Sequence, residues 1–255
     1  MDIVIDKSYL HGATTGEVLR LCQENKVLIP ESLFYELLTT TPKKRVNCFR
    51  KFPDIENPVV LIPNVGTLLR FEVSNKIPCN PVTQLAISNG GKFNTKLRDE
   101  DFCLPLGKIC RWIRKINGEI EDYKKRSAII YYWFPSLEQY RLGQTDTEIS
   151  AAEDSITNDE DFVRKIYEQI RKPNFPESHL IGPGWIIYRW MQINFLTAID
   201  YLRRFGPNNT SVKNKRIEND YLDIEYCIIG AQVGALASND YRMKNIFKKI
   251  CPMVF

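Results

Sequence analysis

The sequence predicts an α/β fold in which helices flank a central parallel sheet, with a large helical insertion. Residues 1–40 alternate strand, helix, strand and helix, an order typical of parallel strands joined by right-handed crossovers. Residues 219–255 return to this alternation. The chain has 255 residues, enough for one domain with a well-buried core. We therefore expect a single domain with its core at about residues 1–65 and 206–255 and the insertion at about 66–205.

Short apolar runs are the candidate strands. Residues 3–5 and 27–29 consist of Ile, Val and Leu, as in parallel strands that are buried on both faces. Residues 59–62, 235–237 and 253–255 are shorter or less regular candidates. Because candidates lie near both ends of the chain, both ends are expected to join one sheet.

Helices are predicted where apolar residues recur every three or four positions. Thr14 and Thr15 offer N-terminal caps for one of them, and Pro30 suits the first turn of the next. The expected helices cover residues 14–25, 31–40, 106–116, 119–132, 148–171, 185–205, 219–233 and 241–250.

The composition indicates a globular, cytoplasmic protein. Hydrophobic residues make up 44% of the chain, and no apolar run approaches the roughly 20 residues that a membrane-spanning helix needs. The N-terminus lacks the basic start and long apolar core of a signal peptide. The seven cysteines are scattered without a Cys-x-x-Cys pair, which argues against a disulfide framework and a zinc site.

Acidic residues follow two of the predicted strands. Asp6 comes directly after residues 3–5, and Asp240 comes shortly after residues 235–237. Where the strand order of a parallel sheet reverses, the carboxyl ends of the strands open a crevice, so these two side chains are expected to converge there. Glu36 lies on the helix after the second strand. Asp220 and Asp223 are three residues apart on a later helix, so both face the same way.

A cluster of carboxylates is the ligand set that a hard divalent cation prefers, and Mg²⁺ or Mn²⁺ would offset the repulsion among the acids. Each acid also has a simpler interpretation. Asp6 and Asp240 could cap the helices that follow their strands, and Asp220 could be a helix cap or a partner of the helix dipole. The joint placement of the acids favours a metal site.

Three motifs in this order resemble those of the PIN-domain nucleases. Residues 6–8 (Asp-Lys-Ser) match the family's opening Asp, which Ser, Thr or Asn follows two positions later. Residues 27–38 match its strand, proline and Glu-bearing helix. Residues 219–223 match its helical Asp, and residues 238–240 (Ser-Asn-Asp) match its Thr/Ser-x-Asp turn. The resemblance covers roughly the first and last 40 residues, and the family core is about half as long as this chain.

The resemblance implies a PIN-like three-layer core and a Mg²⁺- or Mn²⁺-dependent endonuclease that cuts RNA more readily than DNA. Two aspartates compete for the third position, and the spacing to Asp240 favours Asp223. The implied metal ligands are Asp6, Glu36, Asp223 and Asp240, of which Glu36 would also position or activate the water. The implied assisting residues are Ser8, Asp220, Ser238 and Asn239.

Further expectations concern partners. Lys213, Lys215 and Arg216 precede the helix that carries Asp220 and Asp223, where an RNA backbone would run; a plain exposed loop is the alternative. Family analogy implies a toxin or defence effector that is held in check by an inhibitory, antitoxin-like protein or a larger complex, and a homodimer is a further expectation. Two rival functions remain: a non-catalytic PIN-like scaffold that binds RNA or protein, and a structure-specific DNA nuclease.

Overall fold

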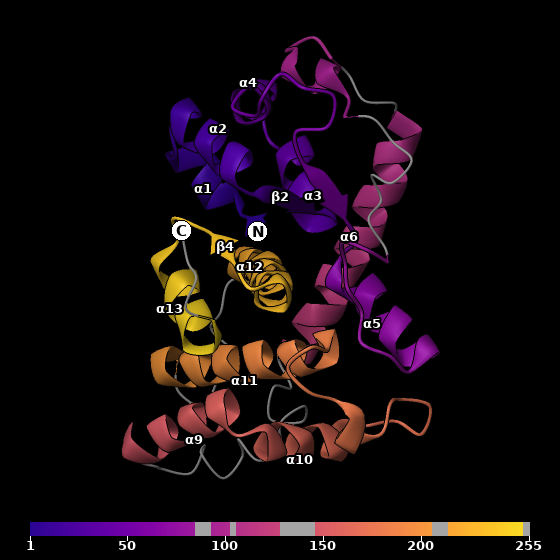
Figure 1. Ribbon diagram of the computed structural model, residues 1–255, viewed down its shortest axis with the longest axis vertical. Helices are drawn as coiled ribbons and strands as arrows, with labels where there is room; N and C mark the ends of the chain where they lie inside the picture. The colour runs from indigo at the N-terminus through magenta and orange to yellow at the C-terminus, as the bar shows by residue number, and fades with distance from the viewer. Residues whose placement is uncertain (85–92, 103–105, 128–145, 206–213, 252–255) are drawn as a thin grey trace.

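The computed structural model describes residues 1–84, 93–102, 106–127, 146–205 and 214–251 (Figure 1). Within them, four parallel strands form one sheet: β1 (Asp2–Ile5), β2 (Lys26–Pro30), β3 (Val60–Ile62) and β4 (Leu236–Ala237). These strands confirm four of the predicted ones. The strand predicted at residues 253–255 lies outside the described residues.

Helices cover the sheet and extend away from it. The helices are α1 (Lys7–Gly12), α2 (Thr15–Glu24), α3 (Glu31–Thr39), α4 (Pro42–Phe49), α5 (Val65–Asn75), α6 (Leu106–Ser127), α9 (Asp146–Asn158), α10 (Glu160–Ile170), α11 (Ile186–Phe205), α12 (Asn214–Val233) and α13 (Tyr241–Ile250). Short 3-10 helices occupy η2 (Thr95–Arg98) and η4 (Ser178–Leu180).

Several helix boundaries differ from the prediction for local reasons. The helices expected at residues 106–116 and 119–132 are continuous across Gly118 in one helix, α6, and residues 128–132 lie outside the described residues. The single helix expected at residues 148–171 is divided into α9 and α10, since the Asp159 carboxylate caps α10 by accepting from the amides of Asp161 and Phe162. α12 begins five residues earlier than expected, and α1, α4 and α5 were not predicted.

The strand order determines where a site can form. The order is β3-β2-β1-β4, so the chain runs outward from β1 through β2 to β3 and then returns to the other side of β1. Val4 pairs with both Leu28 of β2 and Leu236 of β4. The strand order therefore reverses between β1 and β4, and the crevice at their carboxyl ends is the favoured ligand site of such a sheet.

α12 lies close to the sheet because of a glycine. An added Cβ at Gly230 would stand 2.9 Å from the Phe247 ring and 3.2 Å from the Cβ of Leu236, which is too tight for most side chains. Gly230 thus permits the close approach of α12 to β4 and α13.

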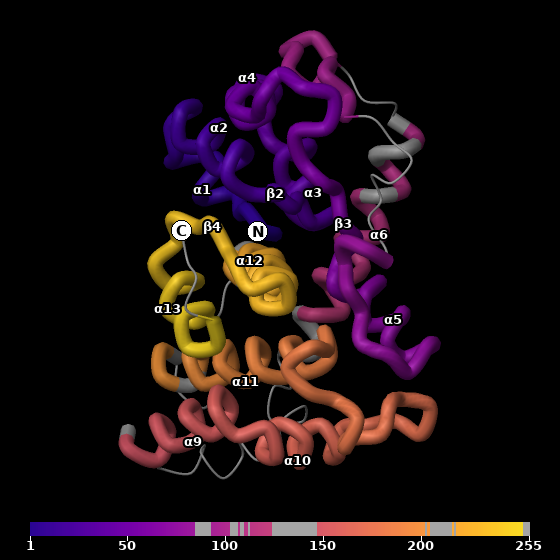
Figure 2. Tube along the Cα trace, viewed as in Figure 1, coloured from indigo at the N-terminus to yellow at the C-terminus, as the bar shows by residue number. Residues whose placement is uncertain are grey.

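Two large hydrophobic clusters and a small third one make up the interior of the described residues. The first surrounds the sheet, the second joins α9, α10 and α11, and the third comprises Tyr35, Ile116 and Ile120. In Figures 1 and 2, α11 lies between α12 and the α9–α10 pair, and it contributes Ile193 to the first cluster and Phe195 to the second. Leu68, Val82 and Leu97 belong to the first cluster, so part of the predicted insertion is built into the sheet's own core.

No helix in the described part of the chain is long and apolar enough to span a membrane. The α/β class with a flanked parallel sheet is confirmed, whereas the PIN-like assignment and the division into core and insertion stay predictions.

Glu72 connects the two large clusters. This buried side chain on α5 accepts hydrogen bonds from the amides of Ile186 and Ile187 at the start of α11 (2.7 and 2.9 Å) and from the amide of Cys79 (2.9 Å). It therefore satisfies donors that the first turn of α11 leaves unpaired. Burial nevertheless raises the pKa of Glu72 from 4.5 to about 7.

The raised pKa predicts a pH-dependent stability. Because the pKa of Glu72 is higher in the folded state than in the unfolded state, its contribution to stability is complete below about pH 4.5 and is lost as pH rises through about 7. The loss is on the order of 3 kcal/mol, at roughly 1.4 kcal/mol per pKa unit. Urea denaturation at pH 5 and pH 8 should show this loss in the wild type, and it should be smaller by that amount in Glu72→Gln. The exposed Asp54→Asn serves as the control, and equal pH dependence in all three proteins would contradict this role of Glu72.

Candidate functional site

Asp6 is the acid most firmly held at the crevice between β1 and β4. Its side chain is 1% exposed. The Tyr9 amide donates to Oδ1 (2.7 Å) and Ser238 Oγ donates to Oδ2 (2.6 Å), while Ser8 Oγ lies within 2.9 Å of both oxygens. Ser238 follows β4 and Ser8 follows β1, so the ends of two neighbouring strands meet on this carboxylate.

Asp240 lies in the same corner. Its Oδ1 accepts from the Met243 amide (2.9 Å), and its own amide donates to Ser238 Oγ (3.0 Å). The amide of Asn239 donates to Ser8 Oγ (2.8 Å), so the Asn239 backbone, and not its exposed side chain, makes this link.

Asp6 and Asp240 both act as helix caps, of α1 and α13, as the simpler interpretation of each predicted. The two aspartates cap their helices and also belong to the acidic cluster. Burial raises the pKa of Asp6, and the negative charge of Asp240 raises it further, because like charges that lie close together disfavour the ionised form.

Glu36 reaches the crevice from α3. Tyr226 of α12 donates its hydroxyl to Oε2 (2.5 Å), and Lys7 Nζ lies 3.2 Å from Oε1. The Glu36 side chain is 14% exposed and that of Lys7 is 32% exposed, so the Lys7 ammonium group lies at the mouth of the site. Tyr226 and Lys7 were missed by the sequence analysis, although Tyr226 lies one helical turn after Asp223.

Asp223 is the central carboxylate of the group. Among the described residues it has no hydrogen-bond or ion-pair partner. Burial raises its pKa to about 8, and the charges of Asp240, Glu36, Asp6 and Asp220 raise it in that order. The other four predicted acids therefore lie close enough to raise the pKa of this one carboxyl group.

Asp220 differs from Asp223 although it is one turn away on the same helix. It is buried, pairs with the Arg242 guanidinium and accepts from the Tyr201 hydroxyl, and Arg216 lies 3.9 Å away. Because α12 begins at Asn214, Asp220 cannot be an N-terminal cap. Of the two aspartates that could fill the third position, Asp220 is therefore paired with a cation, whereas Asp223 has no partner among the described residues.

The structure describes only part of the predicted basic loop. Arg216 is exposed within α12. Lys213 and the side chain of Lys215 lie outside the described residues.

The donor set fits a hard cation, since carboxylates and hydroxyls surround Asp223. As the side chains stand, no group of three or more His, Cys, Asp or Glu in the described residues is placed to hold one ion jointly. The oxygens of Asp6 and Glu36 instead accept hydrogen bonds from neighbouring side chains. Cation binding would therefore require Asp223 and its neighbours to turn toward a common centre.

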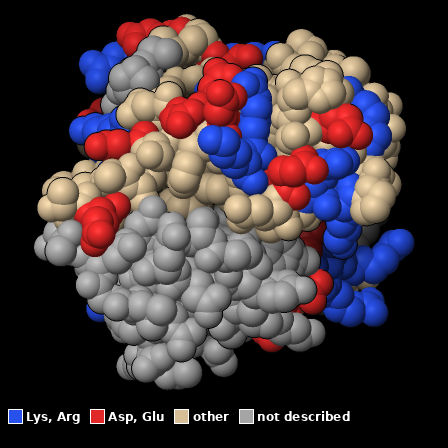
Figure 3. Space-filling view, turned by 90° about the horizontal axis from the view of Figure 1, so that it is seen from below, with Lys and Arg blue, Asp and Glu red and all other residues tan. Residues whose placement is uncertain are grey.

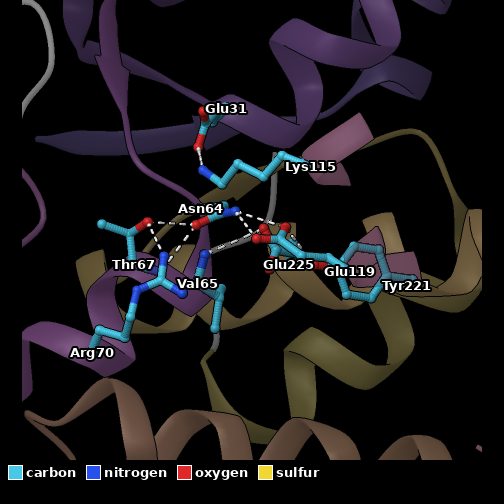
Figure 4. A network of polar contacts seen from close by, with 9 residues as sticks. All are labelled: Glu31, Asn64, Val65, Thr67, Arg70, Lys115, Glu119, Tyr221 and Glu225. Carbon is cyan, nitrogen blue, oxygen red and sulfur yellow. Dashed lines mark hydrogen bonds and ion pairs between the residues drawn. The ribbon is translucent and has the colours of Figure 1, made fainter. Parts of the chain in front are cut away.

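A second polar cluster, which the sequence analysis missed, lies near the carboxyl end of β3 (Figure 4). Asn64 Nδ2 donates to both oxygens of Glu119 (3.1 and 2.8 Å), the Val65 amide donates to Glu225 (3.3 Å), and the Tyr221 hydroxyl lies 3.3 Å from both glutamates. Each carboxylate here has a donor, so this cluster differs from the open Asp223.

Comparisons of the chain with protein-family models, curated proteins and solved structures gave no significant match.

The paired state of Asp220 gives a prediction that separates its role from that of Asp223. Arg242→Met leaves a buried carboxylate without its partner and should lower the free energy of unfolding by about 3–5 kcal/mol. Adding Asp220→Asn should recover part of that loss, because no charge is then stranded. Urea denaturation of both single variants and the double variant forms a complete cycle. Strictly additive effects would show that the pair does not act as a unit.

Proposed function

We propose that this protein is a Mg²⁺- or Mn²⁺-dependent endoribonuclease with a PIN-like core. The observation that carries the proposal is the open Asp223 carboxyl, which is surrounded by Asp6, Glu36 and Asp240 at the point where the strand order reverses. Burial and then repulsion from these acids raise the pKa of Asp223, and a divalent cation is the natural partner that relieves the repulsion.

The residues have distinct roles in this proposal. Asp6, Asp223 and Asp240 would hold the cation, and Glu36 would hold it or orient the attacking water. When bound, such an ion supplies a water that loses its proton near neutral pH and neutralises charge on the phosphate. Ser8 and Ser238 fix the Asp6 carboxylate, and Tyr226 fixes Glu36. Lys7 offers a positive charge to the incoming phosphate at the mouth of the site.

RNA as the substrate, and a toxin or defence role under an inhibitory protein, rest on the family resemblance. The non-catalytic scaffold is the less favoured alternative because all four proposed ligands are present and three of them lie close enough to the fourth, Asp223, to raise its pKa. Parallel digestion of labelled RNA and DNA distinguishes a ribonuclease from a structure-specific DNA nuclease.

Loss of one ligand should abolish cleavage. Asp6→Asn removes the charge that anchors the cation while its size is retained, so RNA cleavage should fall by about 100-fold or more, and EDTA should have the same effect on the wild type. Cleavage of a labelled RNA in Mn²⁺ is measured on a gel. Glu119→Gln, an acid of the second polar cluster, should cleave like the wild type. Cleavage that survives EDTA or Asp6→Asn would refute the proposal.

Cation binding should also stabilise the fold. A ligand that binds the folded state alone raises the melting temperature, and saturating Mn²⁺ should add about 2.7 kcal/mol at 100 times its Kd. Calorimetry should show this rise in the wild type and in Glu119→Gln. It should disappear in Asp223→Asn, which should itself be more stable than the wild type in EDTA because the repulsion is removed. The same Mn²⁺ shift in Asp223→Asn would rule out Asp223 as a ligand.

A further inference from the structure

A groove with a surplus of basic side chains lies between α11 and α13, beside the acidic site. It has a volume of about 520 Å³. α11 comes from the predicted insertion and α13 from the predicted core, so the groove joins the two parts. The side chains that give it its charge are Arg203, Arg204, Arg242, Lys248 and Lys249 against Asp200 and Glu153.

The basic side chains are positioned by shared acids. Glu153 pairs with both Arg203 and Lys249 (2.7 Å each). Asp200 pairs with both Arg204 and Arg242. Each acid serves two cations, and Lys248 is exposed without an acidic partner in the described residues. The groove therefore keeps an excess positive charge, which fits an anionic chain.

Another face of the molecule shows the contrast. On the face seen from below in Figure 3, basic and acidic side chains are interspersed over the described residues. The pairs of α10 are typical: Arg164 contacts both Glu160 and Asp161, and Arg171 contacts both Glu168 and Glu177. In these pairs the acids outnumber the two cations that they neutralise, so the pairs offer a polyanion little.

Tyr241 adds an aromatic platform at the rim of the groove. It directly follows Asp240, and 79% of its surface is exposed. An exposed ring with no packing role next to basic side chains is suited to stacking on a nucleobase. Bases within a duplex are already stacked, so such a ring favours a single strand.

Arg242 connects the groove to the acidic site. It lines the groove, pairs with Asp220 on α12 and follows Asp240 by two residues. The groove and the acidic site therefore share Arg242 as a common wall.

We propose that the α11–α13 groove binds a segment of single-stranded RNA, with a base stacked on Tyr241 and phosphates held by Lys248, Arg203 and Arg204. RNA as the occupant rests on the proposed function, but binding is independent of cleavage. The groove would give the helical insertion a role in placing the substrate.

The test measures binding of the full chain to a fluorescein-labelled oligouridine by anisotropy in EDTA. Tyr241→Ala should weaken binding by about five-fold or more, since it removes one stacking contact. Lys248→Gln should lower the slope of log K against log salt by about 0.7, the value for one phosphate contact on a single strand. Lys26→Gln removes the same charge at the opposite edge of the sheet and should bind like the wild type. Because all three side chains are exposed, equal melting temperatures verify that the variants are folded.

Other outcomes have definite meanings. Unchanged RNA binding in both Tyr241→Ala and Lys248→Gln overturns the proposal. The proposal also fails if a polyglutamate peptide binds more tightly than the RNA and its binding depends on Tyr241 and Lys248. Tyr241→Ala should leave binding to duplex RNA unaffected, and an equal loss there would exclude base stacking. If the groove variants lose RNA binding while the wild type shows no cation-dependent cleavage, the groove is an RNA-binding surface and the nuclease proposal fails.

Discussion

The hydrogen bond between Ser238 and Asp6 is the contact on which the site depends. It joins the end of β4 to the end of β1, two strands that the chain separates by more than two hundred residues. Ser8 reinforces it from the β1 side and Asn239 from the β4 side. Because Asp6 and Asp240 also cap α1 and α13, the same carboxylates that form the site help to set the direction of the next helices.

α12 presents acids in three different electrostatic environments within two turns. Asp220 meets a guanidinium, Asp223 has no donor among the described residues and lies near other carboxylates, and Glu225 meets amide and hydroxyl donors. A helix turns about 100° per residue, so short steps along the chain lead to different neighbours. The chemistry of each acid follows from its surroundings and not from its residue type.

The sequence predicted what depends on local pattern. The strands at residues 3–5 and 27–29 and the helix at 241–250 follow from apolar periodicity, and the gathering of Asp6 and Asp240 follows from their positions after parallel strands. The pairing of Asp220 with Arg242 could not be predicted, because Asp200, Tyr201 and Arg242 come together only when α11 and α13 both pack against α12. The short α1 was missed because its first turn depends on the cap at Asp6.

Gly230 shows how backbone contact governs the spacing of the acids. It lies two helical turns after Asp223, and β4 ends shortly before Asp240, so the distance between helix axis and strand sets how far apart these carboxylates lie. That distance is limited by the contact of the Gly230 Cα with a phenyl ring, a leucine methylene and the Ala235 carbonyl, none of which carries a charge. The spacing of the carboxylates in the site therefore depends on an uncharged contact between α12, β4 and α13.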